Sequence, residues 1–251
     1  MAEFWSNKDF PYLYDTHVHT RQASACGACT GADMARVYKE AGYTGIMITD
    51  HFFYGNTAID RNLEWTDWVE AFSLGYADAK AEGDRIGLQV FWGWESGYHG
   101  TEFLIFGLDK EWLLTHPEIR DASIEEQYKL VHEGGGIVIH AHPYREEDYI
   151  DEICLYPEYV DAVEAVNACH ANPISTHHKN PLFDLKARNY AREHHFPVTA
   201  GSDAHFIDLL GGGMAFQEKL RDVDDFVQAI YTKRICLLTD GHNSCMNYTV
   251  E

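Results

Sequence analysis

Long apolar segments are missing from this sequence of 251 residues. It has no uninterrupted run of 18 apolar residues, which is about the length that a membrane-spanning helix needs. Its first ten residues lack the basic start and the apolar core of a secretory signal peptide. We therefore expect a soluble, cytoplasmic protein that does not insert into a membrane.

Basic residues are scarce. The 19 Lys and Arg stand against 40 Asp and Glu, which gives a formal net charge of −21. A surface of this sign repels the phosphate backbone of nucleic acids, so we do not expect nucleic-acid binding. Most of the acidic residues are interpreted as solvated surface. The composition does not indicate an oligomeric state.

Several sequence motifs are also absent. The six cysteines include one C-x-x-C pair, Cys26 and Cys29, but not the second pair that a zinc ribbon needs. A disulfide framework is not expected in a chain of this size, and a thioredoxin-like use of the pair stays open. There is no G-x-S-x-G nucleophile motif and no P-loop. The glycines at 134–136 and 211–213 are interpreted as turns or flexible loop.

Apolar segments of strand length alternate with segments of helical period. The predicted strands are 12–18, 45–49, 87–94, 103–107, 136–139, 162–166, 198–200 and 235–239. The predicted helices are 32–41, 65–81, 124–133, 181–194 and 223–231. Short apolar strands without polar alternation are typical of parallel strands covered on both faces. Alternation of strand and helix predicts an α/β fold, and the length suits one β/α barrel over residues 1–251. An open doubly wound sheet is the alternative.

Histidine is abundant, with 15 residues in the chain, and histidine is the commonest metal ligand. Potential ligands follow the ends of most predicted strands. They lie in Asp15-Thr-His17-Val-His19-Thr20, Thr49-Asp50-His51, Trp94-Glu95, His140-Ala-His142-Pro143, Glu164-Ala-Val-Asn167 and Gly201-Ser202-Asp203-Ala204-His205. In a barrel the carboxyl ends of all strands meet on one face, so these residues are expected to share one site.

The spacing of these residues suits a metal cluster. His17 and His19 are two apart on a strand, so both side chains point the same way, and Asp203 and His205 repeat the spacing. Imidazole and carboxylate together suit Zn²⁺, Mn²⁺ or Fe²⁺. Glu95 can bridge two ions through its two oxygens. Two ions about 3.5–4 Å apart can hold both the attacking and the leaving oxygen of a displacement.

The order of these motifs resembles the PHP (polymerase and histidinol phosphatase) superfamily. Its pattern is D-x-H-x-H-T, T-D-H, a Glu after the third strand, A-H-P and G-S-D-x-H. This sequence has DTHVHT (15–20), TDH (49–51), WE (94–95), AHP (141–143) and GSDAH (201–205). The resemblance implies a distorted (β/α)7 barrel and a metal-dependent phosphoesterase with two or three divalent ions.

The resemblance also implies a distribution of ligands. His17, His19, Glu95 and Asp203 would bind the first ion, Glu95 and His142 the second, and His51 and His205 a third or the second. Three-metal members often carry a further His or Asp after the H-T pair, where this chain has Cys26. Many members carry a His on the fourth strand, where this chain offers Glu102 or, slightly earlier, His99.

Other polar residues near these motifs are assigned supporting roles. Asp15 and Asp50 are expected to orient imidazoles. Arg145 is expected to bind a phosphate oxygen, with a surface ion pair to Glu146 or Glu147 as the alternative. Further residues in the same part of the barrel are Asn167 and His170, which are expected to face the site. Four histidines are interpreted as loop or helix-surface residues: His177, His178, His194 and His195.

The function expected first is hydrolysis of a small phosphomonoester by a metal-activated water. His205 or Asp203 would relay a proton to the leaving oxygen. Specificity would depend on the loops 52–63, with Tyr54, and 144–159. One alternative is a metal-dependent C–N or C–O hydrolase of the amidohydrolase type, and another is a non-catalytic metal-binding PHP module. The expected partner is a small phosphorylated molecule whose identity the sequence does not reveal.

Overall fold

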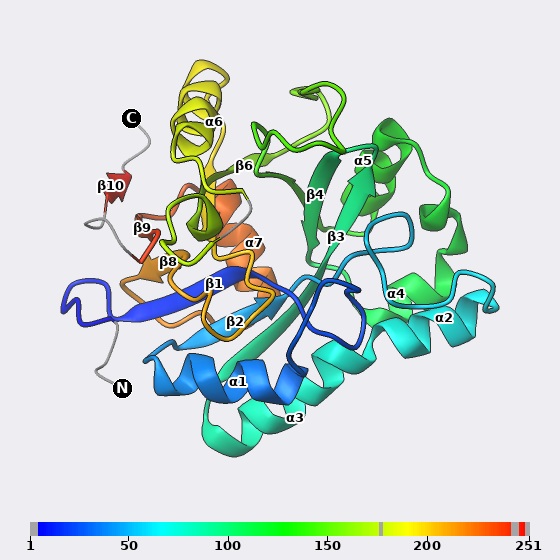
Figure 1. Ribbon diagram of the computed structural model, residues 1–251, viewed down its shortest axis with the longest axis horizontal. Helices are drawn as coiled ribbons and strands as arrows, with labels where there is room; N and C mark the ends of the chain where they lie inside the picture. The colour runs from blue at the N-terminus through cyan, green and yellow to red at the C-terminus, as the bar shows by residue number, and fades with distance from the viewer. Residues whose placement is uncertain (1–4, 176–177, 242–245, 249–251) are drawn as a thin grey trace.

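The computed structural model describes residues 5–175, 178–241 and 246–248 (Figure 1). The strands are β1 (Tyr12–Val18), β2 (Gly45–Ile48), β3 (Gln89–Tyr98), β4 (Thr101–Phe106), β5 (Ile137–Ala141), β6 (Ala162–Asn167), β7 (Val198–Gly201), β8 (Gly213–Phe216), β9 (Cys236–Thr239) and β10 (Met246–Tyr248). The helices are α1 (Gly31–Glu40), α2 (Trp65–Phe72), α3 (Leu74–Ile86), α4 (Lys110–Thr115), α5 (Ile124–Glu133), α6 (Leu182–Glu193) and α7 (Val223–Tyr231), with 3₁₀ turns at Pro117–Arg120 and Ala168–His170. Within these ranges no helix is long and apolar enough to cross a bilayer.

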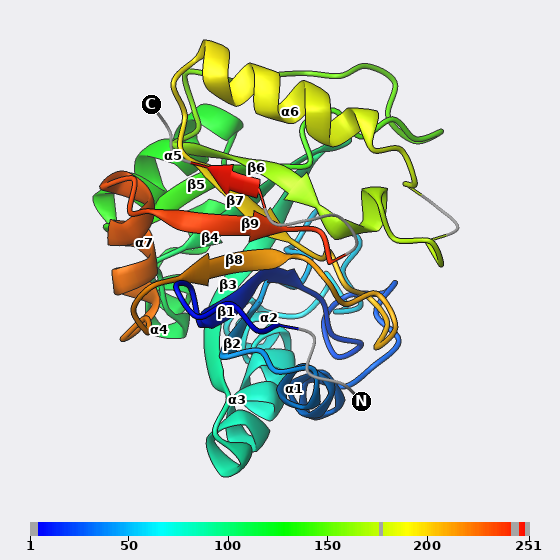
Figure 2. The ribbon, with the colours of Figure 1, turned by 90° about the vertical axis from the view of Figure 1, so that its left-hand side faces the viewer.

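All the strands join one sheet in the order β10-β9-β8-β1-β2-β3-β4-β5-β6-β7. The sheet curls until the segment after β7 reaches β1, where Val18 and Ala204 form a parallel bridge. There the His19 N–H donates to the Ala204 carbonyl oxygen at 3.0 Å. The fold is therefore a mixed α/β fold with a nearly closed, barrel-like sheet. In Figure 2, α6 lies on one side of the strands, and α1 and α3 lie on the other.

The predicted strict alternation of strand and helix is wrong at β3 and β4. These strands form an antiparallel hairpin, and β4 also pairs antiparallel with β5. The chain turns at His99 and Gly100, whose φ angles are 49° and 92°. Positive φ at both central residues is the pattern of a type I′ turn, which favours a tight hairpin over a helical crossover.

Two further predictions are corrected. The predicted helix 65–81 is two helices, α2 and α3, which meet at Ser73. Residues 213–216, the first of them predicted as turn or loop, form β8, which pairs antiparallel with β1 and β9. Strands β8, β9 and β10 thus extend the sheet beyond the curled part. The other predicted helices and strands are confirmed to within a few residues at their ends.

A close approach of helix to sheet supports the end of β1. An added Cβ at Gly75, in the first turn of α3, would lie 2.1 Å from Thr20 Oγ1 and 2.7 Å from Asp50 Oδ2. The Thr20 hydroxyl donates to Asp50 Oδ2 at 2.7 Å. Only glycine therefore lets α3 pack against this polar pair, whose members are the chain neighbours of the predicted ligands His19 and His51.

Candidate metal centre

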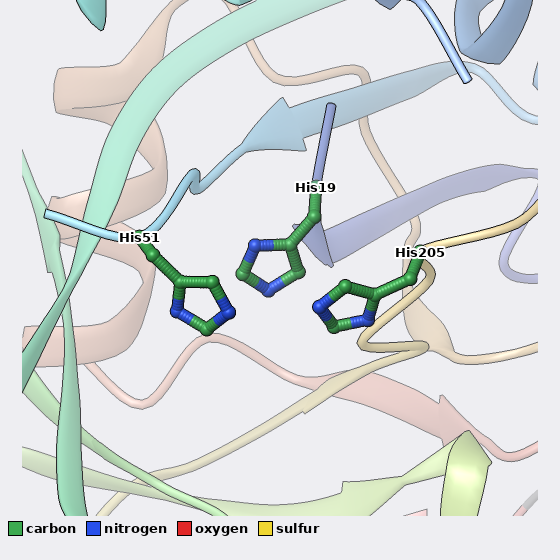
Figure 3. A group of neighbouring side chains, drawn as sticks. All are labelled: His19, His51 and His205. Atoms are coloured by element: carbon green, nitrogen blue, oxygen red, sulfur yellow. The ribbon is translucent and has the colours of Figure 1, made fainter. Parts of the chain in front are cut away.

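The structure brings all seven sequence-predicted ligands to the carboxyl ends of the strands. His17 lies within β1 and Glu95 within β3, whereas the other ligands follow strand ends. All seven are buried except His205, whose side chain is 17% exposed. Figure 3 shows that the imidazoles of His19, His51 and His205 converge from separate segments. The centroid of the His19 ring lies 4.4 Å from that of His51 and 4.2 Å from that of His205.

The separations between ligand atoms fit a metal ion. His17 Nε2 lies 3.3 Å from Glu95 Oε1 and 3.4 Å from Asp203 Oδ1. His19 Nε2 lies 3.2 Å from the same Asp203 oxygen. Ligands at the usual zinc bond lengths of about 2.0–2.1 Å stand roughly 3.3 Å apart around a tetrahedral ion. Each of these pairs therefore has the separation of two ligands of one ion.

Four ligand atoms of this cluster have no hydrogen-bond partner among the described residues. They are His17 Nε2, His19 Nε2, His51 Nδ1 and Glu95 Oε2, and each is buried. Buried polar atoms are nearly always hydrogen-bonded, because an unpaired one loses its hydration without compensation. Two of them, His51 Nδ1 and Glu95 Oε2, lie 2.8 Å from each other without forming a hydrogen bond of good geometry. Four buried atoms of the metal-ligating type that face one another in this way fit bound cations better than they fit a structural role.

The candidate ligands form overlapping groups, within each of which the ligand atoms lie within 4.8 Å of one another. The groups are His17/His19/Asp203, His17/Glu95/His142, His51/Glu95/Glu102 and His19/His51/His205. Because each group shares a member with another, the donor set suits a cluster of neighbouring ions. Glu95 belongs to two groups, as do His17, His19 and His51, but of these four residues only Glu95 has two oxygens with which to bridge two ions.

The three alternatives for a further ligand are placed differently. Glu102 joins the group of His51 and Glu95, whereas His99 lies exposed on the rim of the cavity. Cys26 lies beside two imidazoles. Burial raises the pKa of its thiol, but hydrogen bonds with His205 and His51 outweigh burial and lower the pKa to about 6.

A glutamate inside β6 orients two of the ligands. Glu164 Oε1 lies 2.9 Å from His17 Nδ1, and Glu164 Oε2 accepts the backbone N–H of His142 at 3.0 Å. Asn167 Nδ2 donates to the same Oε2 at 3.1 Å and faces the site as expected. A carboxylate on the far nitrogen of a ligating histidine fixes its ring and tautomer. The sequence placed Glu164 near the site but did not indicate this role.

The two aspartates expected to orient imidazoles act otherwise. Asp15 Oδ1 accepts the backbone N–H groups of His17 and Ser202, and its other oxygen accepts the Tyr38 hydroxyl. It therefore ties β1 to the segment after β7, and the expectation that it contacts an imidazole is wrong. Asp50 acts through an intermediary. It accepts the Ser24 hydroxyl at 2.7 Å, and Ser24 Oγ lies 3.0 Å from His19 Nδ1.

The charged groups perturb one another strongly. Burial would lower the pKa of His17, but the carboxylates of Asp203, Glu164 and Glu95 raise it well above its usual value. Burial lowers the pKa of His19, and the neighbouring imidazoles of His205 and His51 add to that effect. Such opposed shifts within one cluster of buried groups are typical of functional sites.

Arg145 is buried beside this cluster. Its Nη2 lies 2.5 Å from Asp203 Oδ2, and its Nε lies 3.5 Å from His170 Nε2. Although burial raises the pKa of Asp203, Arg145 and His17 hold it well below its usual value. The alternative of a surface ion pair is wrong, because Glu146 pairs with Lys186 and Glu147 with His178.

Two predicted ligands have a backbone conformation that non-glycine residues seldom adopt. The φ angle is 25° at His142 and 54° at Asp203. His142 directly follows β5 and Asp203 is the second residue after β7, so both unusual turns lie at the carboxyl ends of strands. Strain of this kind concentrates at functional sites.

A cavity of about 760 Å³ opens beside the cluster. It is lined by Tyr54 and Tyr149, one from each predicted specificity loop, and also by Ile174, Phe206 and Leu209. His178 lines this cavity too, whereas His177 lies outside the described residues. The sequence did not single out the apolar residues at 174, 206 and 209, because an isolated apolar residue in a loop gives no signal of its own.

Comparisons with known proteins agree with this geometry. A family model described as PHP-associated (PHP_C) matches residues 183–235. The curated proteins contain no detectable sequence relative of this chain.

Solved structures share the fold. One is a two-domain protein from Bacteroides vulgatus that contains a predicted PHP-like metal-dependent phosphoesterase, with a TM-score of 0.61 and 12% identity over 90% of this chain. This chain spans 64% of that protein's length. Another is a candidate metal-dependent phosphoesterase from Bifidobacterium adolescentis, with a TM-score of 0.52 and 17% identity, covering 88% of this chain and 96% of that one. The matched C-terminal segment and the shared fold thus confirm the resemblance of this chain to the PHP superfamily.

Proposed function

We propose that this chain is a metal-dependent phosphoesterase that hydrolyses a small phosphomonoester in a site of two or three divalent ions. The observation that carries the proposal is the set of buried imidazole and carboxylate atoms that face one another at ligand–ligand spacing, several of them without a hydrogen bond among the described residues. Both similar structures are named as phosphoesterases, which supports a phosphoester as the bond that this chain hydrolyses. The described helices and strands are interpreted as one distorted (β/α)7 barrel domain over residues 1–251.

The ligand groups suggest how the ions would be held. His17, His19 and Asp203 would hold one ion. Glu95, which lies 3.3 Å from His17 Nε2 and 3.1 Å from His142 Nε2, would reach both this ion and a second one near His142. His51 and His205 would hold a third, with Glu102 or Cys26 as the further ligand. The mixture of imidazole and carboxylate suits Zn²⁺, Mn²⁺ or Fe²⁺. Divalent ions supply Lewis acidity and an activated water at neutral pH.

The remaining chemistry falls to residues of this chain. The Arg145 guanidinium lines the cavity beside the cluster and can hold a phosphoryl oxygen. His205 and Asp203 are the candidates to pass a proton to the leaving oxygen, and His205 is better suited. Burial lowers the pKa of His205, but Cys26 and Asp203 outweigh burial and raise it. An imidazole binds a metal ion in its neutral form, so His205 would act as the acid only where it does not hold the third ion. Asp203 stays ionised.

The test is phosphate release from a panel of phosphomonoesters and phosphodiesters by protein loaded with Mn²⁺ or Zn²⁺. We expect turnover of a monoester that is lost in His19→Ala. A parallel panel of amides and lactones examines the amidohydrolase alternative. Release of phosphate by His19→Ala at the wild-type rate, or no release from metal-loaded wild-type protein, would contradict the proposal.

A further inference from the structure

The mouth of the cavity is surrounded by exposed apolar side chains. Tyr54, Tyr149, Ile174 and Phe206 are each between 49% and 60% exposed, and all four line this cavity. They come from separate loops that follow β2, β5, β6 and β7. Single exposed apolar residues are common, but several that meet around one concave site mark a binding surface.

The same mouth offers little positive charge. Among the described residues that line the cavity, Arg145 is the single Lys or Arg, and Asp203 already pairs with it. The lining also contains the acidic residues Glu102 and Asp208. A ligand group that carries negative charge away from the metal cluster would meet carboxylates and apolar rings, without a cation to stabilise it.

The cavity is large enough to hold a second chemical group beside the phosphoryl group that reacts. A cavity of about 760 Å³ is within the range of sites that enclose a drug-sized molecule, and a lone phosphoryl group would fill little of it. Three of the predicted ligands, His51, Asp203 and His205, line the cavity together with the buried Arg145. Phe206 follows His205 directly in the chain, so the apolar mouth begins next to the cluster.

We propose that the substrate is the phosphomonoester of an alcohol that carries a flat, uncharged apolar ring. The ring lies among Tyr54, Tyr149, Ile174 and Phe206, and the phosphoryl group reaches the ligand cluster. This inference rests on the proposed phosphoesterase function and adds the class of substrate. Flat rings stack on aromatic side chains without needing specific hydrogen bonds.

The first experiment compares 2-phenylethyl phosphate with ethyl phosphate on Mn²⁺-loaded protein. Both esters release a primary alcohol of similar basicity, so a difference in kcat/KM reports binding of the ring. We expect the ring ester to be favoured by on the order of tenfold, the effect typical of one stacked ring. Phe206→Ala and Tyr149→Ala should each lower this ratio towards one. Leu182→Ala, which removes an equally exposed residue of α6 outside the cavity lining, should leave the ratio unchanged.

A binding experiment separates this inference from the proposed function. Calorimetry compares the non-hydrolysable 2-phenylethylphosphonate with ethylphosphonate on the same metal-loaded protein. Ring preference in binding without turnover of any ester would support the ligand class and contradict the phosphoesterase. Turnover of both esters with a kcat/KM ratio near one would support the phosphoesterase function and contradict the preference for a ring-bearing substrate. A 4-carboxy substituent on the ring should weaken binding at least tenfold, and equal binding would overturn the requirement for an uncharged group.

Discussion

Glu164 Oε1 lies 2.9 Å from Nδ1 of His17, while Nε2 of His17 faces Glu95 and Asp203 and has no hydrogen-bond partner among the described residues. The carboxylate thus fixes the ring whose free nitrogen is offered to a metal. Glu164→Gln should keep the shape and lose the charge. We expect metal affinity to fall about 10- to 100-fold, measured by competition with a chelator. Glu193→Gln, at the end of α6 outside the cavity lining, is the matched control, and an equal loss there would refute the orienting role.

Glu95 belongs to two of the ligand groups, whereas His205 belongs to one. Glu95→Ala should therefore remove more than one equivalent of metal per chain, and His205→Ala should remove at most one. The measurement is metal content by mass spectrometry after loading and desalting. A loss of one equivalent in both variants would show that Glu95 does not bridge.

Cys26 is expected to bind metal at the position near His51 and His205. A protein loaded with Co²⁺ should then show thiolate-to-metal charge transfer in the near ultraviolet, because a thiolate is a good ligand for ions of this kind. Cys26→Ser should abolish the band, and Cys29→Ser should retain it. Absence of the band from the wild-type protein would leave Glu102 as the ligand at this position, and a band that survives in Cys26→Ser would show that another cysteine supplies the thiolate.

The Arg145 guanidinium is planar and places several donors at once, which a lysine cannot reproduce. Arg145→Lys should lower kcat by on the order of 100-fold, the usual cost of a lost donor to developing charge. Lys186→Met, which removes an exposed cation paired with Glu146, should have little effect. Metal content measured in parallel separates a loss of substrate contact from a loss of metal.

Stability should depend on pH through a carboxylate remote from the site. Arg234 lies 2.7 Å from Asp225 Oδ1, and its hydrogen bond holds the pKa of Asp225 below its usual value against the effect of burial. Because the folded-state pKa is depressed, this contribution is present above the unfolded pKa of about 3.9 and is lost as the pH falls.

Asp225→Asn should therefore lower the free energy of unfolding by about 1.5–3 kcal/mol at neutral pH and by less near pH 3. Urea unfolding of metal-free protein at both pH values measures this difference. Asp224→Asn, one residue earlier on α7 and exposed, is the control. An equal loss at both pH values would assign the effect to packing instead of charge.

The predicted ligands could be found from the sequence because their signals are local. A histidine or acidic residue directly after an apolar run can be placed at a strand end, and barrel topology then brings the strand ends together. Glu164 gave a weaker signal, since it lies inside a buried strand and its partner His17 is far away in the sequence. The break at Ser73 was missed because the apolar period of 65–81 continues through it. β8 was missed because its four residues follow glycines typical of a loop.

The nearly closed sheet has its seam between β1 and the segment after β7, where Val18 and Ala204 meet. His17 and His19 stand on one side of that seam, and Asp203 and His205 stand on the other. Ions bound between them would crosslink β1 to the segment after β7 and so stabilise the closure of the sheet. Removing the metal would then weaken the closure of the barrel as well as stop the reaction. The same few ligand atoms would therefore determine both the stability of the fold and the rate of catalysis.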